Sequence, residues 1–199
     1  MRLVIATHNE KKGGEMRTIL SELLPGVELL TLNDFPKVEE PEETGTTYSE
    51  NASIKAEHAA AHTGEWCIAD DAGLEIDALE GAPGVFSKRF GGEALPFPEK
   101  MVLILEALNG REDRAARFRC CIALARSGQK TEVIEATCEG QIAEEPSGAG
   151  GFGYDPIFWL PELGCTMADL SAAQKHEISH RGKVLRCFAD RFPGVIHSR

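Results

Sequence analysis

The sequence predicts an α/β fold, and three observations support this prediction. Apolar runs typical of buried strands alternate with segments in which apolar residues recur every three or four positions, as in helices. The 199 residues are 42% hydrophobic and 27% charged, which is ordinary for a globular chain with a substantial core. Two adjacent carboxylates, Asp70 and Asp71, follow the apolar run 67–69, and open α/β sheets bind ligands at the carboxyl ends of strands. We expect a single domain over residues 1–199, or two closely joined lobes.

The first predicted strand is the β-branched run 2–7, and a helical pattern follows it. Thr7, Asn9 and Lys12 would meet at the start of this helix. Free backbone N–H groups, the helix dipole and an ammonium favour a phosphate there. The pattern is not a Walker A loop, and a simple capped helix start is an equally good interpretation of these residues alone. The apolar face of the predicted helix consists of Met16, Ile19, Leu20, Leu23 and Leu24.

A second strand is predicted at residues 27–32, and an acidic segment at 33–47 follows it. The default interpretation of such a charge run is a solvated loop, although it could lend a carboxylate to a nearby metal. Residues 48–62 are expected to form a helix with Ser49 as its N-cap. This helix carries Glu50, Asn51 and Lys55.

The Asp70-Asp71 pair is expected at a turn, where Ala72 and Gly73 let the chain bend before a second strand at 74–76. Two neighbouring negative charges repel each other unless a proton or a cation lies between them. Mg²⁺, which prefers oxygen ligands, would serve as that cation. For the pair alone, a solvated acidic turn is the simpler interpretation.

The second half of the chain adds a helix after Pro96, a β-hairpin from the strands 117–126 and 131–142, and a helical end at 168–192. Lys100 is expected on the solvated side of the helix after Pro96. The loop 146–155 is rich in glycine, which lets backbone approach a ligand closely. Phe152 and Tyr154 in this loop offer flat faces for a base.

Composition excludes several classes of function. The net charge of −11 argues against nonspecific binding to nucleic acid or to anionic membranes, which requires a basic surface. No apolar run is long enough to cross a bilayer, and we expect no signal peptide at Met1. The six cysteines lack CxxC spacing, so we expect reduced, buried thiols in a cytoplasmic protein.

Six motifs occur in a fixed order along nearly the whole chain. They are Thr7-x-Asn9-x-x-Lys12-x-x-Glu15; Glu43-Thr44-Gly45 with Glu50-Asn51-Ala52 and Lys55-Ala56; Ala69-Asp70-Asp71-x-Gly73-Leu74; Gly81-Ala82-Pro83-Gly84 with Ser87 and Arg89; Gly150-Gly151-Phe152-Gly153-Tyr154-Asp155-Pro156; and Ser179-His180-Arg181-Gly182. Together they resemble the inosine triphosphate pyrophosphatase family, whose members hydrolyse deaminated purine nucleoside triphosphates. The resemblance implies a central mixed β-sheet flanked by helices, two lobes with an active-site cleft between them, and a homodimer.

The resemblance also implies the reaction and the residues that perform it. ITP, dITP and XTP would be hydrolysed to the nucleoside monophosphate and pyrophosphate with Mg²⁺, before they enter DNA or RNA. Asp71 matches the proton acceptor and a metal ligand, and Glu42 matches the second metal ligand, although Asp70 and Glu43 could exchange these roles. The substrate-binding positions would be Thr7, His8, Asn9, Glu10, Lys11, Lys12, Ala72, Phe152, Gly153, Tyr154, Asp155, Lys175, His180 and Arg181, with Lys55 and Arg89 in support.

Within this set, residues 7–12 would hold the triphosphate together with Lys55 and Lys175, and residues 152–155 would hold the base together with His180 and Arg181. Ala72 departs from the family pattern, since a serine is common there. Two other interpretations stay open. One is a pyrophosphatase for modified pyrimidine or other damaged nucleotides, and the other is a nucleotide-binding regulator without activity.

Overall fold

The computed structural model describes residues 1–36 and 38–197 of the chain. One seven-stranded sheet has the order β2-β1-β3-β4-β5-β6-β7. Its strands are β1 (Arg2–Ile5), β2 (Glu28–Thr31), β3 (Trp66–Ile76), β4 (Ala115–Ala125), β5 (Glu132–Ile142), β6 (Phe158–Leu160) and β7 (Cys165–Thr166). β1 pairs in parallel with β2 and β3, whereas β6 pairs antiparallel with β5 and β7. The prediction of an α/β fold with a mixed sheet is confirmed.

The chain divides into two compact units. The first unit contains residues 1–71, 120–136 and those from 181 onward, and the second contains residues 72–119 and 137–180. Each of the long strands β3, β4 and β5 contributes residues to both units. On β3 the change from one unit to the other falls between Asp71 and Ala72.

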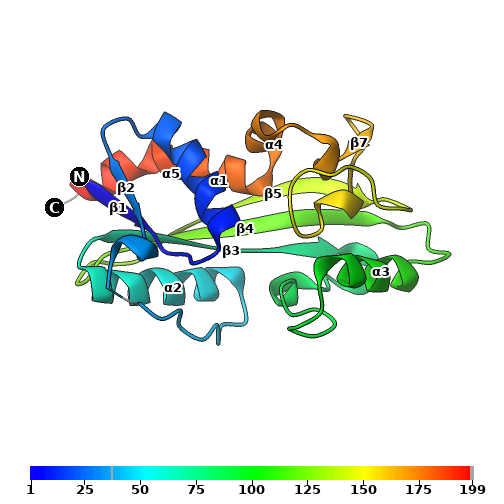
Figure 1. Cartoon of the computed structure of the whole chain (residues 1–199), viewed down its shortest axis with the longest axis horizontal. Coiled ribbons are helices and arrows are strands. Elements are labelled where there is room, and N and C mark those ends of the chain that lie inside the picture. Colours follow the sequence, from blue (N-terminus) through cyan, green and yellow to red (C-terminus); the bar gives the residue numbers. More distant parts are fainter. Residues whose placement is uncertain (37, 198–199) are drawn as a thin grey trace. The chain divides into compact units, whose positions relative to one another are not determined.

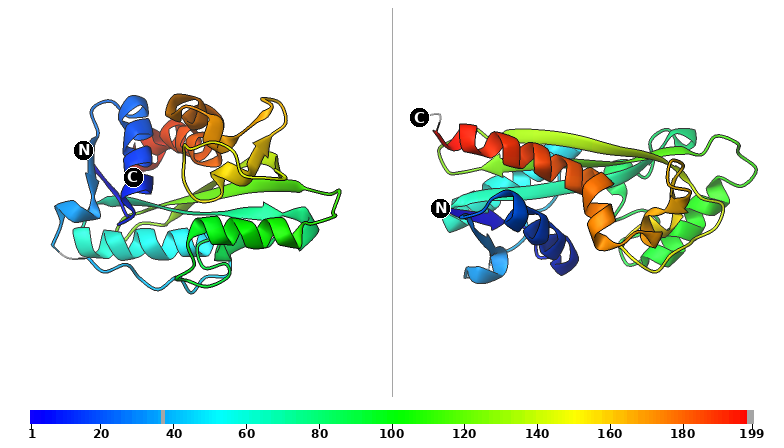
Figure 2. Two further views of the ribbon diagram at one scale, coloured as in Figure 1. Left: turned by 45° about the vertical axis from the view of Figure 1, so that its right-hand side comes forward. Right: turned by 90° about the horizontal axis from the view of Figure 1, so that it is seen from above.

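Helices cover both faces of the sheet within each unit. They are α1 (Glu10–Leu23), α2 (Tyr48–Thr63), α3 (Phe97–Ala107), α4 (Ala172–Ile178) and α5 (His180–His197). In the first unit α2 lies on one face, and α1 and α5 lie side by side on the other (Figures 1 and 2). In the second unit α3 and α4 lie on opposite faces (Figure 1).

β1 and α1 pack together in the interior of the first unit. Leu3, Val4 and Ile5 of β1 are fully buried, and α1 contacts both β1 and β2. The buried side of α1 includes Met16 and Leu20, both at 0% exposure. The predicted apolar face of this helix is therefore confirmed for its central residues. α1 begins beyond the end of β1, and this leaves residues 6–9 as a short loop between them.

β3 corrects the prediction of a turn at Ala72 and Gly73. The structure has one strand from Trp66 to Ile76, so Asp70 and Asp71 lie within the strand and not at its end. Both carboxylates are buried, with 3% and 7% of their surface exposed. The solvated acidic turn is therefore excluded. Buried charges require partners, and the first unit supplies them.

The start of α2 differs from the prediction in its cap. Thr47, and not Ser49, is the N-cap, because the Thr47 hydroxyl accepts a hydrogen bond from the Glu50 N–H at 3.2 Å. The Glu50 carboxylate in turn accepts hydrogen bonds from the Thr47 N–H at 3.1 Å and from the Thr46 N–H at 2.7 Å. This reciprocal capping box fixes the end of the acidic segment against the helix.

Lys100 also corrects a prediction. It was expected on a solvated helix face, but its side chain is buried at 1% exposure. The ammonium donates hydrogen bonds to three backbone carbonyls, those of Lys88 at 2.7 Å, Phe90 at 2.9 Å and Gly92 at 2.8 Å. Helical periodicity placed Lys100 beside exposed neighbours, whereas the loop 88–92 folds over it. One buried lysine thus ties three carbonyls of this loop to α3, in addition to the loop's own backbone hydrogen bonds.

We expect Lys100→Met to lower the free energy of unfolding by about 2–4 kcal/mol, because three backbone carbonyls lose the Lys100 ammonium as a donor at once. Chemical denaturation followed by circular dichroism would measure this. Lys130→Met is the control, since Lys130 is exposed in the turn between β4 and β5, and it should change stability by less than about 0.5 kcal/mol. Equal effects of the two substitutions would contradict the role of Lys100.

The cysteines are free thiols, as the sequence predicted, but not all of them are buried. Cys67, Cys120, Cys121 and Cys138 are buried, Cys165 is partly buried and Cys187 is exposed. Burial raises the pKa of the Cys67 thiol to about 11. Cys187 therefore corrects the expectation of uniformly buried thiols. Among the described residues, no helix combines the length and the apolar character needed to cross a bilayer.

Candidate active site

The loop between β1 and α1 has the features of an anion-binding helix start. Asn9 caps α1, because its side-chain oxygen accepts a hydrogen bond from the Lys12 N–H at 3.1 Å. The Thr7 hydroxyl accepts a hydrogen bond from the Asn9 N–H at 3.1 Å. The His8 N–H donates to a carboxylate oxygen of Glu40 at 3.1 Å, so an anionic oxygen binds at this amide. The helix dipole favours negative charge at this position, and the Glu40 carboxylate already lies there; the N–H groups of Asn9 and Lys12 donate to side chains of the loop itself.

The predicted phosphate-binding residues differ in exposure. His8, Asn9, Glu10 and Lys11 are exposed, and Thr7 is partly buried. The His8 ring also lies 2.8 Å, through Nε2, from the carbonyl oxygen of Val38. Lys12 is different, since its side chain is 23% exposed and its ammonium lies 3.4 Å from Asp70. Of the two neighbouring lysines, only Lys12 joins the buried charges of the first unit.

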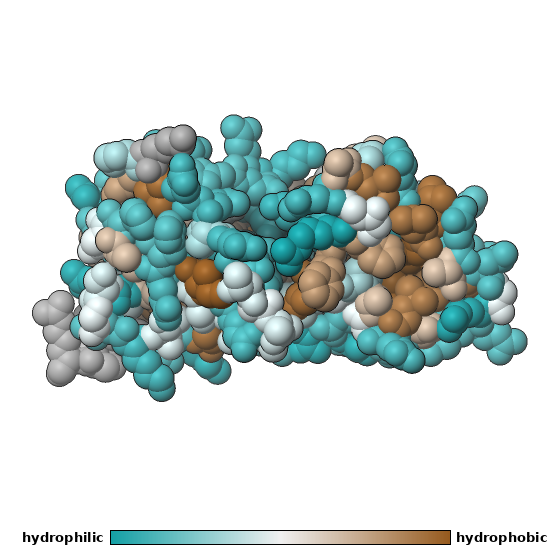
Figure 3. Space-filling model, turned by 90° about the horizontal axis from the view of Figure 1, so that it is seen from below, coloured by the Kyte–Doolittle hydropathy of each residue, from teal (hydrophilic) through white to brown (hydrophobic). Residues whose placement is uncertain are grey.

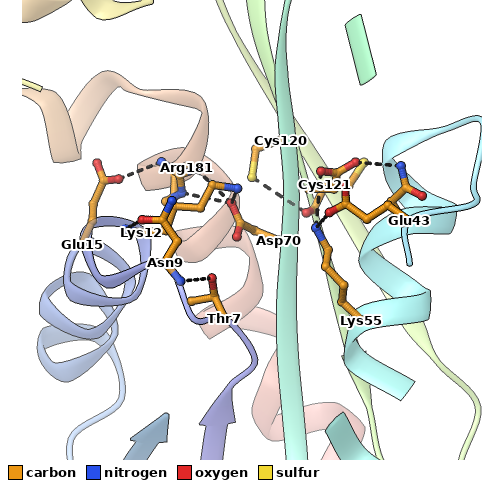
Figure 4. A network of polar contacts seen from close by, with 12 residues as sticks. Thr7, Asn9, Lys12, Glu15, Glu43, Lys55, Asp70, Cys120, Cys121 and Arg181 are labelled. Carbon is orange, nitrogen blue, oxygen red and sulfur yellow. Dashed lines mark hydrogen bonds and ion pairs between the residues drawn. The ribbon is translucent and has the colours of Figure 1, made fainter. Parts of the chain in front are cut away.

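Asp70 lies at the centre of a buried ion-pair cluster (Figure 4). Its Oδ2 accepts hydrogen bonds from Arg181 Nη2 at 2.9 Å and Nε at 3.3 Å, and the Lys12 ammonium lies near the same oxygen. Arg181 Nη1 donates to Glu15 at 2.7 Å. Burial alone would raise the pKa of Asp70, but the positive charges of Lys12, Arg181 and Lys55 outweigh burial and hold it well below its usual value. These cations thus favour the ionised form of Asp70.

Asp71 has a different environment. Its Oδ1 lies 3.4 Å from the Lys55 ammonium, and its Oδ2 accepts a hydrogen bond from the Asn51 side-chain amide at 3.2 Å. Lys55 is shared, because it also donates to Glu43 at 2.7 Å (Figure 4). Burial raises the pKa of Asp71, and the charges of Glu43 and Asp70 raise it further against the opposing effect of Lys55 and Lys12.

The two adjacent aspartates therefore differ in what they can do chemically. Asp70 lies beside two close cations, which favour a fixed negative charge there. Asp71 has a raised pKa, so its carboxylate has the greater tendency to take up a proton. Neighbouring carboxylates whose pKa values are driven apart by their surroundings are typical of sites that transfer protons.

Glu42 and Glu43 also differ in position. Glu43 is partly buried and contacts Lys55, while Glu42 is exposed. Within residues 1–36 and 38–197, no three Asp, Glu, His or Cys side chains are arranged to hold a metal ion together. Asp71 and Glu43 offer two carboxylates beside one ammonium, and Mg²⁺ is commonly held by one or two protein carboxylates with phosphates and waters as its other ligands. The chemistry of this donor set fits Mg²⁺.

The second unit contains a separate polar cluster in the glycine-rich loop. Asp155 is 2% exposed, and its Oδ2 accepts hydrogen bonds from the Lys175 ammonium at 2.7 Å and from the Phe152 N–H at 2.7 Å. The Lys175 ammonium also lies 4.4 Å from the centre of the Phe152 ring. A Cβ atom at Gly151 would lie 2.1 Å from Asp155, so the loop can close around this carboxylate only with glycine there. The Phe152 ring is held in place and stays partly exposed.

Tyr154 does not offer the flat face that the sequence suggested. It is 3% exposed, its hydroxyl donates to the carbonyl of Ser87 at 2.9 Å, and its ring packs edge-on against Phe97. The Ser87 hydroxyl accepts a hydrogen bond from the Leu74 N–H on β3 at 2.9 Å. Tyr154 thus anchors the glycine-rich loop to the interior of the second unit.

The remaining predicted residues lie in both units. In the second unit His180 is buried and stacks on Phe118, with ring centres 4.8 Å apart. Arg89 lies over the exposed ring of Phe86, while Ala72 and Gly153 are partly buried. Arg181 belongs to the first unit with Asp70. The structure thus brings Lys12, Asp70 and Arg181 together, and separately Asp155, Lys175 and Phe152.

Sequence reasoning gave no role to three residues that organise these clusters. Glu15 binds the far side of Arg181, Asn51 contacts Asp71, and Ser87 connects Tyr154 to β3. Each of them lies inside a motif, but the spacing of a motif does not show which of its members face one another. The spacing of Asn51 and Lys55, four apart on one helix, could have indicated that they share a face.

Comparison with known proteins shows the family of the chain. Residues 3–191 match the model of the Ham1 family. A dITP/XTP pyrophosphatase from an Exiguobacterium species is 47% identical over 94% of both chains. One from Geobacillus kaustophilus is 45% identical over 98% of this chain and 95% of its own. A HAM1 protein structure from Coxiella burnetii has a TM-score of 0.89 and 41% identity, and covers 98% of this chain and 99% of its own. The chain therefore belongs to the Ham1 family.

Proposed function

We propose that this chain hydrolyses the deaminated purine nucleoside triphosphates ITP, dITP and XTP to the nucleoside monophosphate and pyrophosphate. The observation that carries the proposal is the unequal pair of carboxylates on β3, with Asp70 neutralised by cations and Asp71 of raised pKa beside Lys55. The relatives named dITP/XTP pyrophosphatase support the class of substrate. Its role would be to remove these nucleotides before they enter DNA or RNA, and we expect it to act in the cytoplasm.

Hydrolysis of a phosphoanhydride requires that negative charge on the phosphates is neutralised and that a water is activated in line with the bond that breaks. Asp71 would accept the proton of this water, since a carboxylate of raised pKa is the better base near neutral pH. Lys12 and the N–H groups at the start of α1 would bind phosphate oxygens. Asp70 would hold Lys12 and Arg181 in place.

Asp71 and Glu43 would hold Mg²⁺, with Glu42 as the alternative second ligand that the family resemblance suggests. Glu43 is preferred because it shares Lys55 with Asp71, whereas Glu42 is exposed. When bound, the ion would neutralise charge on the phosphate oxygens. When no ion is bound, the Lys55 ammonium, which contacts both carboxylates, would offset the repulsion between them.

Base recognition is assigned to the cluster in the second unit. The partly exposed Phe152 ring provides a stacking face, and Lys175 fixes it from one side. Lys175 is paired with buried Asp155, which favours a role near the base over the role at the triphosphate that the sequence suggested. Tyr154 would support the loop from below without contacting the base.

The test is an analysis of products. The purified chain is incubated with ITP and Mg²⁺, and the products are separated by ion-exchange chromatography. We expect equal amounts of inosine monophosphate and pyrophosphate, with no product after removal of Mg²⁺ by EDTA and recovery when it is restored. Inosine diphosphate with phosphate would contradict the proposal. Turnover of a modified pyrimidine triphosphate but not of ITP would favour the first alternative, and no turnover of either would favour a binding protein.

Lys12→Ala should raise KM for ITP or lower kcat/KM by about 10-fold or more, because one phosphate-neutralising charge is lost. Steady-state pyrophosphate release would measure this. The control is Lys130→Ala, a lysine exposed in the turn between β4 and β5. Lys100 would be a poor control because it is buried. If Lys12→Ala and Lys130→Ala behave alike, the loop 7–12 does not bind the triphosphate.

We further propose that the chain forms a homodimer through the exposed face of α3. Apolar side chains gather on this part of the second unit (Figure 3). Phe97, Val102 and Leu103 of α3 are 36%, 51% and 38% exposed, and neighbouring Phe86 is 60% exposed. Such a group of exposed apolar side chains on an acidic chain favours contact with a second copy.

The chain should therefore sediment at about twice its mass of 21.6 kDa at micromolar concentration. Val102→Glu should shift the sedimentation to the monomer, because a charge would be buried at the contact. Leu163→Glu is the matched control, since Leu163 is equally exposed at 53% but lies outside α3. An active monomer of the unmodified chain would refute the dimer, and a dimer unaffected by Val102→Glu would place the contact elsewhere.

A further inference from the structure

Asn51 connects Asp71 to the acidic segment before α2. Its side chain is 0% exposed, and both ends of its amide are used. The oxygen accepts a hydrogen bond from the Gly45 N–H at 2.8 Å, and the nitrogen donates to Asp71 Oδ2 at 3.2 Å. Because a backbone N–H can only donate, the contact with Gly45 determines which end of the amide is the oxygen. The NH₂ group must then face Asp71.

Lys55 completes a closed ring of contacts. It lies four residues after Asn51 on α2, which places both side chains on the same face of the helix. Lys55 contacts Asp71 Oδ1 at 3.4 Å and Glu43 at 2.7 Å. Asn51 and Lys55 therefore hold different oxygens of Asp71 and different residues of the segment 43–45. The ring runs through Asp71, α2 and this segment, all within the first unit.

Gly45 makes the close approach possible. A Cβ atom there would lie 2.6 Å from the Asn51 oxygen and 2.6 Å from Glu50 Cβ, closer than side chains can come. Any other residue would push the segment 43–45 away from the amide. The contact between Gly45 and Asn51 is thus built into the fold, and the amide that faces Asp71 is held from behind.

We propose that Asn51 is a positioning residue for Asp71. Its amide restricts rotation of the Asp71 carboxylate and keeps the segment that carries Glu43 in register with it. The inference rests on the proposed function, in which Asp71 accepts the proton of the attacking water. The last side-chain torsion of a carboxylate is broad, so Lys55 alone fixes Asp71 less well than Lys55 and Asn51 together, and a misplacement of about 1 Å can cost about 10²-fold in rate.

The contact itself is tested by exchanging the two groups. Asn51→Asp places two carboxylates where an amide met a carboxylate, and it should lower Tm by several degrees, about 4–8 °C. The double variant Asn51→Asp with Asp71→Asn restores an amide–carboxylate pair in the opposite order. The fall in Tm of the double variant should be smaller than the sum of the falls in the two single variants, by at least about half of the fall caused by Asn51→Asp. Additive effects would show that residues 51 and 71 are not coupled and would overturn the proposal.

The positioning role is tested by kinetics with ITP and Mg²⁺. Asn51→Asp keeps an acceptor for Gly45 but loses the donor to Asp71, so we expect kcat to fall by about 10-fold or more while KM changes less than about 3-fold. Glu50→Gln is the matched control. Glu50 holds the same segment through Thr46 and Thr47, and none of these contacts involves Asp71.

Glu50→Gln should lower Tm but keep kcat within about 3-fold of the unmodified chain. If both variants lower Tm and have the same kcat as each other, Asn51 only stabilises the segment 43–45 and the inference is wrong. If the unmodified chain releases no pyrophosphate, the proposed function fails. The exchange experiment still decides in that case whether Asn51 and Asp71 are coupled, because it measures stability and requires no substrate.

Discussion

Asp71→Asn is expected to reduce turnover of ITP by about 10²-fold or more while the chain stays folded. An amide cannot take the proton of the attacking water, and it is a weaker ligand for Mg²⁺ than a carboxylate. The fold should tolerate the change because burial already disfavours the charged form of Asp71, as its raised pKa shows. Single-turnover pyrophosphate release and a thermal melt of the same sample would measure both effects.

Asp70→Asn, at the neighbouring position, is the informative comparison, because this variant should lose stability whereas Asp71→Asn should stay folded. Asp70 is ionised in the fold and holds Arg181 and Lys12, so neutralising it leaves buried cations without their carboxylate. We expect a loss of about 3–5 kcal/mol in the free energy of unfolding. Normal activity of Asp71→Asn with unchanged Mg²⁺ dependence would move the role of base to another residue. An unfolded Asp71→Asn with a stable Asp70→Asn would reverse the assignment of the two carboxylates.

The sequence predicted the parts of the fold that depend on local pattern. The apolar face of α1 and the loop with Thr7 and Asn9 before it follow from periodicity and helix-start chemistry, whereas the mixed sheet was implied by the family resemblance. Asp70 and Asp71 were recognised as a pair that needs a cation, and the structure supplies lysine and arginine around them. The helix face and the loop before it are encoded within short stretches of chain.

The features that were missed depend on contacts between distant residues. Asp70 and Asp71 were expected at a turn because Ala72 and Gly73 can let the chain bend after them, yet the strand continues, and Arg181, more than a hundred residues away, pairs with Asp70 inside it. Lys100 was placed in solvent because its helix is amphipathic, but the loop 88–92 covers it. A sequence pattern does not show which loop will fold over which side chain.

The roles of residues within one motif were equally hidden. Glu42 and Glu43 are adjacent in sequence, and only the structure distinguishes the one that contacts Lys55 from the exposed one. Similarly, His180 and Arg181 are adjacent, but His180 stacks on Phe118 while Arg181 is enclosed by Asp70 and Glu15. Arg181 was expected to help hold the base, but Arg181→Ala cannot test this role, because the change would first disrupt a buried charge cluster.

The second large effect expected is in the choice of base, with kcat/KM for ITP and XTP exceeding that for ATP by about 10²-fold or more. Hypoxanthine and xanthine carry an acceptor oxygen at position 6 and a hydrogen on N1, whereas adenine carries a donor amino group at position 6. A pocket rich in donors pairs with the oxygen but faces the amino group of adenine unfavourably. Lys175 and the N–H groups of Gly151 and Gly153 would be such donors, whereas those of Gly150, Phe152 and Asp155 already donate within the chain. Guanine has the same oxygen at position 6, so the site would have to exclude it through its extra amino group at position 2.

Variants in the second unit separate affinity from choice. Phe152→Leu removes the stacking face that every purine can use, so it should lower kcat/KM for ITP and ATP by similar factors. Lys175→Met removes a donor and should lower the ratio of kcat/KM for ITP to kcat/KM for ATP. Lys175→Arg keeps a cation opposite Asp155 and should preserve most of this ratio. Thermal melts identify any variant that fails to fold. Equal kcat/KM for ITP and ATP in the unmodified chain would refute the assignment of deaminated purines, and an unchanged ratio in folded Lys175→Met would assign the discrimination to the backbone of the loop.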